Sequence, residues 1–227
     1  NISSNGAVTV TGSESGATVE YSTDGGSTWG SSFTASVGGN NVTVRQTDTA
    51  GNTSATTNLI FTLDTSAAAP TVVLATDSGS ASDDLITNDG SLTVTGETGA
   101  TVEYSIDSGT SWGSSFAATE GDNTVQVRQT DVAGNVSDAT TLTFTLDTTI
   151  AAPTVALTTD AGSSASDTIT NDGTLSVTDT ETAATIEYST DGGTSWLATA
   201  PATDTAGANT VLVRQTDTAG NVSDTTT

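Results

Sequence analysis

The chain has 227 residues and a formal net charge of −24, with 27 Asp and Glu residues against three Lys and Arg residues, and it contains no Cys, His or Met. This composition excludes disulfide bonds, metal sites with nitrogen or sulfur ligands, and catalysis by a thiolate or an imidazole. It also argues against binding to nucleic acid or to anionic membranes, because both need Lys and Arg. We predict no enzymatic activity, no nucleic-acid partner and no direct membrane insertion.

The sequence repeats itself three times. The segments VEYSTDGGSTW, VEYSIDSGTSW and IEYSTDGGTSW end at Trp29, Trp112 and Trp196, which are 83 and then 84 residues apart. A second motif, VRQTD followed by Thr or Val and then AGN, recurs with each of them. We therefore divide the chain into a first repeat (1–66), a second repeat (67–149) and a third repeat (150–227). The first is expected to lack its first strand, and the third its last.

The second repeat shows the predicted elements in full. Apolar residues alternate with polar ones, as in half-buried strands, and Gly, Asn, Asp and Ser mark the turns. The predicted strands cover residues 71–75, 92–96, 102–106, 115–118, 124–130 and 141–146, with one further short edge strand. About seven short strands without a helix predict an immunoglobulin-like β-sandwich. We therefore expect an all-β chain of tandem immunoglobulin-like domains arranged end to end.

The predicted strand directions place acidic loops at both ends of each sandwich. The turns at 97–100 and 131–137 lie at one end, while the segment after the first strand, the hairpin at Asp107 and the end of the last strand at Asp147 lie at the other. Short linkers bring opposite ends of neighbouring repeats together. We expect the neighbouring repeats to be each other's partners at these joints.

The joints are predicted to bind Ca²⁺, which takes about six to eight hard oxygen ligands. Two Gly- and Ser-rich loops each carry two carboxylates, Asp64 and Asp147 end the last strands, and Asp131 and Asp217 enter the facing turns. The candidate metal ligands, including two hairpin carboxylates at the same end, are Asp24, Asp64, Asp77, Asp84, Asp107, Asp131, Asp147, Asp160, Asp167 and Asp217. The alternative for each Asp is capping of its own turn through hydrogen bonds to the backbone.

The Trp motifs resemble the Asp-box hairpins of sialidases, in which Asp and Gly shape a turn and the Trp packs beneath it. A sialidase activity does not fit, because the required cluster of arginines is absent. We expect each Trp to pack on its hairpin; the alternative is stacking on sugars. The alternation also predicts a cross-strand ion pair in each repeat: Glu20 with Arg45, Glu103 with Arg128, and Glu187 with Arg214.

The combination of AAPTVVLATDSGSASDDLITNDG, the Trp hairpin, VRQTDVAGN and LTFTLDT resembles the bacterial Ig-like repeats of giant secreted biofilm adhesins of the BapA-like and RTX type. The resemblance implies a secreted extender at the bacterial cell surface, stiffened by calcium at its joints, with other domains of the protein contacting host, surface or matrix glycans. It supports metal roles for Asp77, Asp84, Asp131 and Asp147. Two alternatives remain: carbohydrate-binding modules, or a structural subunit of a surface layer or filament.

Overall fold

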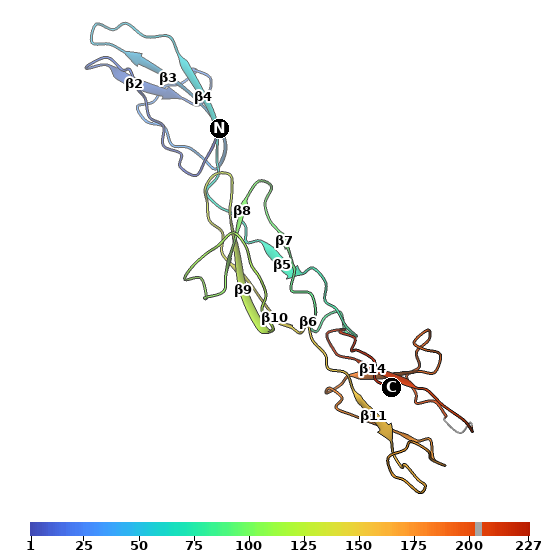
Figure 1. Ribbon diagram of the computed structural model, residues 1–227. Helices are drawn as coiled ribbons and strands as arrows, with labels where there is room; N and C mark the ends of the chain where they lie inside the picture. The colour runs from blue at the N-terminus through green and yellow to red at the C-terminus, as the bar shows by residue number, and fades with distance from the viewer. Residues whose placement is uncertain (203–205) are drawn as a thin grey trace. The chain divides into compact units, whose positions relative to one another are not determined.

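The computed structural model describes residues 1–202 and 206–227 and contains strands and turns, with no helix among those residues (Figure 1). The described residues therefore include no helix long and apolar enough to span a membrane. The all-β prediction is confirmed. The strands are β1 (Ile2–Ser3), β2 (Thr18–Ser22), β3 (Gly38–Thr47), β4 (Thr57–Leu63), β5 (Thr71–Leu74), β6 (Ile86–Thr87), β7 (Leu92–Thr95), β8 (Thr101–Ser105), β9 (Gly121–Thr130), β10 (Thr140–Leu146), β11 (Thr154–Leu157), β12 (Leu175–Thr178), β13 (Thr185–Ser189) and β14 (Leu212–Thr216).

The first two repeats share one sheet topology. In the first repeat a four-stranded sheet has the order β1-β4-β3-β2, and in the second the order is β6-β10-β9-β8. The first strand of each order runs parallel to its neighbour, so β1 pairs with β4 and β6 with β10. The second repeat adds the pair β5-β7, which lie side by side in Figure 1. The third repeat contains the pairs β11-β12 and β13-β14.

The chain divides into two compact units, and the division passes through the second repeat. One unit comprises 1–72, 94–116 and 125–141, and the other comprises 73–93, 117–124 and 142–227. Each linker between repeats therefore lies inside a single unit, together with the parts of both repeats that flank it.

The core is thin and follows from the alternation of residues along the strands. In the first repeat Val42, Phe61 and Leu63 are buried and are covered by partly buried apolar neighbours. On β9 of the second repeat, Val125 and Val127 have no exposed surface. Because alternate side chains of a strand point to opposite faces, the inward face of β9 buries Asn123, Val125, Val127 and Gln129, while Thr124 and Arg128 lie on the other face.

Two details of the second repeat differ from the sequence prediction. The prediction of a strand over residues 115–118 was wrong, because the structure shows no strand there. Instead Tyr104 exchanges both backbone hydrogen bonds with Gly113, at 2.8 and 2.9 Å, so the pairing with β8 ends at a single bridge. In turn, β6 lies within a segment predicted to be a polar loop, since two residues are too few to show alternation.

The predicted ion pairs are confirmed in all three repeats. Each Glu lies directly opposite its Arg in the strand register. The distance from a guanidinium nitrogen to a carboxylate oxygen is 2.9 Å for Arg45, 3.0 Å for Arg128 and 2.8 Å for Arg214. The guanidinium also lies over the Trp ring of the same repeat, 3.9–4.1 Å from its centroid. Each indole N–H donates to a glycine carbonyl of its own hairpin. The Trp residues therefore pack on their hairpins, each with one ring face covered by Arg.

We expect Phe144→Ala to lower the free energy of unfolding of the second repeat by about 3–5 kcal/mol, because it opens a cavity at a buried aromatic side chain. Phe144 is 2% exposed, whereas Ile106 in the same repeat is 75% exposed. Ile106→Ala is the matched control and should change stability by less than about 0.5 kcal/mol. Urea denaturation followed by circular dichroism measures both variants. Equal losses in the two would show that β10 does not supply the core.

Candidate metal centre

The linker between the second and third repeats is held by side chains of the third repeat. The Asn221 side chain donates to the Asp147 carbonyl at 2.7 Å, and the Gln215 side chain donates to the Ala151 carbonyl at 2.7 Å. The Thr226 hydroxyl donates to the carbonyl of Pro153 at 2.6 Å. Backbone carbonyls lose water when they are buried and need such partners. The path of the linker is therefore fixed by the repeat that follows it.

The linker between the first and second repeats is held in the same way. Asn135 donates to the Asp64 carbonyl at 2.8 Å and Gln129 to the Ala68 carbonyl at 2.7 Å. The Thr140 hydroxyl donates to the carbonyl of Pro70. We call these two regions the first joint (linker 64–70) and the second joint (linker 147–153).

The second joint gathers three carboxylates. One carboxylate oxygen each from Asp147, Glu181 and Asp217 lies within 4.8 Å of the other two. Asp217 is 6% exposed, and the other two residues are half-buried. Asp147 ends the second repeat, and the other two belong to the third. The sequence analysis named Asp147 and Asp217 but missed Glu181.

Glu181 is positioned by the same Gln that holds the linker. The Gln215 side chain accepts a hydrogen bond from the Glu181 amide at 3.0 Å, and the Ala151 amide donates to the Glu181 carboxylate at 3.3 Å. Gln215 is completely buried. A sequence signal for this role exists, because Glu14 and Glu97 stand at the corresponding turns and their amides donate to Gln46 and Gln129.

This cluster of acidic side chains suits a hard divalent cation. Two unit charges about 4 Å apart near a protein surface repel each other by about 4 kcal/mol at an effective dielectric constant of about 20. Asn221 offsets part of this repulsion, since its amide and side chain donate to the Asp217 carboxylate at 2.8 Å each. All three side chains offer oxygen, which is the ligand that Ca²⁺ and Mg²⁺ prefer. The remaining ligands of a bound ion would be carbonyls and water.

The first joint repeats the turn but not the cluster. Asp131 is 7% exposed; burial alone would raise its pKa, but hydrogen bonds from Asn135 and neighbouring amides outweigh this and lower it. In the described part of the chain, its carboxylate does not form a comparably tight group with those of Asp64 and Glu97. The two joints therefore share the linker contacts and differ in their carboxylates.

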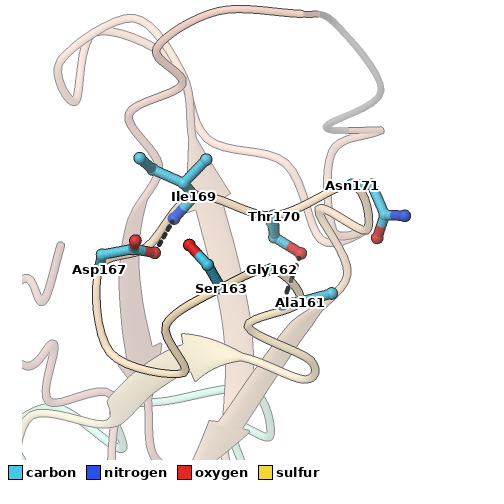
Figure 2. A pocket seen from close by; sticks show the side chains of 7 residues that line it. All are labelled: Ala161, Gly162, Ser163, Asp167, Ile169, Thr170 and Asn171. Carbon is cyan, nitrogen blue, oxygen red and sulfur yellow. Dashed lines mark hydrogen bonds between the residues drawn. The ribbon is translucent and has the colours of Figure 1, made fainter.

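The hydrogen bonds of the carboxylates in the acidic loops 77–90 and 160–173 lie mainly within each loop. One oxygen of Asp77 accepts from the Leu85 amide at 3.2 Å, and one oxygen of Asp160 accepts from the Thr168 amide at 3.1 Å. The other oxygen of each is buried and has no hydrogen-bond partner. Asp84 and Asp167 accept from the amides two residues later, as Figure 2 shows for Asp167 and Ile169. Turn capping thus describes Asp84 and Asp167, and an unpaired oxygen distinguishes Asp77 and Asp160.

The loop of the second repeat also contacts the turn of the third repeat at the second joint. The Ser78 hydroxyl donates to the Ala219 carbonyl at 2.6 Å. Gly79 lies so close that an added Cβ would be 2.0 Å from the Thr218 carbonyl oxygen. Glycine is therefore required at this position by the approach of two backbones.

Asp24 and Asp107 are engaged inside their own hairpins. Asp107 accepts hydrogen bonds from the hydroxyl and amide of Ser111 and from the hydroxyl of Ser105, which lower its pKa to about 2. Asp24 accepts the same set from Thr28 and Ser22, and its pKa is lowered as well. Such a saturated carboxylate caps its turn. We therefore assign these two residues to the hairpins and leave them out of the metal centre.

Comparison with known proteins finds a family match within the chain. Residues 66–148 match the bacterial Ig-like domain family. Among solved structures, the chain is similar to the fibronectin(III)-like modules of CbhA from Clostridium thermocellum, with 18% identity over 56% of this chain and 76% of that chain and a TM-score of 0.31. No curated protein sequence matches the chain. The family match thus covers the second repeat and supports a bacterial Ig-like character for it.

The hairpin carboxylates make stability depend on pH. The pKa of Asp107, and likewise that of Asp191, is about 2 in the folded chain, whereas the ordinary pKa of an Asp side chain is 3.8. Because the folded pKa is the lower one, the stabilisation is complete above about pH 4 and is lost as the pH falls toward 2. Asp107→Asn should therefore destabilise the second repeat at pH 6, and the difference from wild type should shrink between pH 4 and pH 2. Urea denaturation at several pH values measures this, and a difference that does not change with pH would refute it.

We expect Gly79→Ala to loosen the second joint, because its Cβ would meet the Thr218 carbonyl oxygen. Gly121→Ala is the matched control: both glycines have positive φ angles, +98° and +89°, but nothing lies within 4 Å of the Cβ position at Gly121. Both variants carry the backbone strain, and only the first carries the clash. Hydrogen exchange of the peptide covering linker 147–153 should accelerate in Gly79→Ala alone. Equal acceleration in both variants would show that the loop does not support the joint.

Proposed function

We propose that the chain is a spacer segment of a secreted bacterial cell-surface adhesin, stiffened by Ca²⁺ bound at the second joint by Asp147, Glu181 and Asp217. The observation that carries this proposal is the convergence of three carboxylates from two repeats within 4.8 Å. A cation held there would link the end of the second repeat to two turns of the third repeat. The neighbouring repeats are then the principal partners of each other.

Calcium would act on a linker that hydrogen bonds already guide. The carbonyls of Asp147, Ala151 and Pro153 are bound by the third repeat, so the linker path does not depend on metal. What the cation adds is relief of the repulsion between carboxylates. With a Kd of about 0.1–1 mM, as in extracellular calcium modules, and ~10 mM calcium, the bound state gains roughly 1.4–2.7 kcal/mol.

The spacer role agrees with the character of the repeats. A bacterial Ig-like domain is matched in the second repeat, and the other two repeats carry the same hairpins and turns. Nucleophilic catalysis by Ser or Thr would lack the usual activating base, because His, Lys and Cys are absent from the sequence. Attachment to host, surface or matrix glycans would belong to other domains of the adhesin, and biofilm formation would follow from that attachment.

The alternative of carbohydrate binding through Trp is less well supported. Stacking on a sugar needs an open ring face, and the guanidinium of Arg128 lies 4.1 Å from the centroid of the Trp112 ring. The same arrangement recurs at Trp29 and Trp196. The indole N–H groups are also bound to their hairpins, so they are not presented to a ligand.

Glu181→Gln tests the calcium proposal. The substitution keeps the shape of the side chain and removes one charge from the cluster, so calcium affinity at the second joint should fall roughly tenfold or more, since ligand charge sets affinity in such sites. Glu14→Gln is the matched control, because Glu14 occupies the same turn of the first repeat and its amide donates to Gln46 in the same way, at 2.9 Å. Isothermal titration with CaCl₂ measures both variants.

The stiffening is tested independently of calcium affinity by small-angle scattering, which compares the distance distribution of the chain in calcium and in a chelator. We expect the chelator to broaden the distance distribution of the wild-type chain and of Glu14→Gln. In Glu181→Gln the broadened distribution should already appear in calcium concentrations that saturate the wild type. Identical calcium affinity in the two variants would remove Glu181 from the site, and identical scattering with and without calcium would remove the stiffening role.

A further inference from the structure

The turn that follows β1 contains an Asn-Gly pair, Asn5-Gly6, and no other Asn in the sequence is followed by Gly. Asn5 is exposed, so water and hydroxide can reach its side chain. Gly6 has no room for a side chain, because an added Cβ would lie 2.5 Å from the Cβ of Ala35. The packing of the first repeat therefore requires glycine after Asn5, and glycine leaves its own nitrogen sterically open to the neighbouring carboxamide.

Hydrogen bonds on both sides hold Asn5 in this turn. The Ala7 amide donates to Oδ1 of Asn5 at 2.9 Å, which is the contact of an Asx turn. The Ser3 hydroxyl donates to the Asn5 carbonyl at 2.7 Å and accepts from the Asn5 amide at 3.1 Å. The Asn5 carboxamide is thus folded back toward the peptide bond that links it to Gly6.

Two of these contacts polarise Asn5 in the direction that attack on its carboxamide requires. When a nitrogen attacks the side-chain carbonyl carbon, negative charge collects on Oδ1, to which the Ala7 N–H already donates. Donation from Ser3 to the Asn5 carbonyl draws electrons from the peptide bond to Gly6, so the Gly6 N–H becomes more acidic. An amide nitrogen must lose this proton before it can act as a nucleophile.

The second and third repeats carry Asp in the same turn. Asp89 accepts from the Ser91 amide at 3.0 Å, and the Thr87 hydroxyl donates to the Asp89 carbonyl at 3.2 Å. Asp172 accepts from the amide two residues later, also at 3.0 Å. Hydrogen bonds from the side chain and the amide of Ser91 lower the pKa of Asp89, so this turn stabilises a charged carboxylate. The turn that holds Asn5 therefore also suits Asp.

We propose that Asn5 is a site of spontaneous deamidation, promoted by its own turn. The Gly6 nitrogen gives its proton to hydroxide and bonds to Cγ of Asn5; Nδ2 takes up a proton and leaves as ammonia, which closes a succinimide ring. Water then hydrolyses one of the two ring C–N bonds and leaves Asp or isoaspartate at position 5. The net reaction consumes water and releases ammonia, and it needs no oxidant or cofactor.

The turn discriminates between the two products. Asp keeps the backbone and can accept the Ala7 amide as Asn5 does, whereas isoaspartate carries an additional methylene in the backbone and breaks the turn. Because the ring can form again from either product, the folded chain should collect Asp. The inference does not depend on the proposed calcium site, which lies at the second joint.

The test compares the 227-residue chain with the free peptide NISSNGAVT, which is residues 1–9. Both are incubated at the same mildly alkaline pH, and peptide mapping by mass spectrometry follows each Asn. Asn5 should convert at least as fast in the folded chain as in the peptide, because the turn supplies both polarising donors. The folded chain should also give a larger share of Asp over isoaspartate, and its other Asn residues should convert far more slowly.

Two neighbouring serines provide the matched variants. Ser3→Ala removes the donor to the Asn5 carbonyl and should slow conversion in the folded chain about fivefold, the rate equivalent of one hydrogen bond. Ser4→Ala removes an exposed hydroxyl that is bonded to none of the described residues and should leave the rate unchanged. In the free peptide, neither substitution should alter the rate.

Circular dichroism melts check that both serine variants remain folded and also examine the product directly. Asn5→Asp should melt no lower than the wild type, because the same turn holds Asp in the other two repeats. Slower conversion of Asn5 in the folded chain than in the peptide, equal rates in the two serine variants, or a lower melting temperature of Asn5→Asp would each overturn the proposal.

Discussion

The joints of this chain depend on one interaction, the hydrogen bonding of linker carbonyls by side chains of the following repeat. The Gln215 side chain donates a hydrogen bond to the Ala151 carbonyl and accepts one from the Glu181 amide. One buried amide side chain thus fixes both the linker and the turn that carries a carboxylate. Asn221 does the same for the Asp147 carbonyl and the Asp217 carboxylate. The acidic cluster follows from these hydrogen bonds of Gln215 and Asn221, because they place acidic residues of two repeats side by side.

Carboxylates that such hydrogen bonds bring close together must themselves be hydrogen-bonded, protonated or bound to a cation. Asp217 is largely buried, and the amide and side chain of Asn221 donate hydrogen bonds to its carboxylate. These neutral donors leave the charges of Asp147 and Glu181 beside it. The first joint has the same linker hydrogen bonds, but its carboxylates are less tightly grouped. The path of the linker therefore does not depend on how closely the carboxylates gather. The linker path depends on hydrogen bonding, whereas the stiffening by calcium that we propose would depend on the carboxylates.

Local patterns predicted much of the fold and only part of the site. Alternation located the long strands, and the outward position of both Glu103 and Arg128 on neighbouring strands gave the correct cross-strand register. The stacking of Arg128 on Trp112 was missed, because it joins a strand to a hairpin whose approach no spacing encodes. Glu181 was missed for a similar reason: it stands far from Asp147 and Asp217 in the sequence, and only Gln215 brings it to them. The hairpin carboxylates were placed among the metal ligands because composition counts charge and does not show which oxygens are already hydrogen-bonded.

The most direct test of the calcium-bound joint is a crystal structure grown in millimolar calcium, with anomalous diffraction used to locate the ion. The account predicts an anomalous peak between the carboxylates of Asp147, Glu181 and Asp217, with oxygen ligands at about 2.3–2.6 Å. A well-ordered second joint with these three carboxylates still together, and no peak between them, would contradict it.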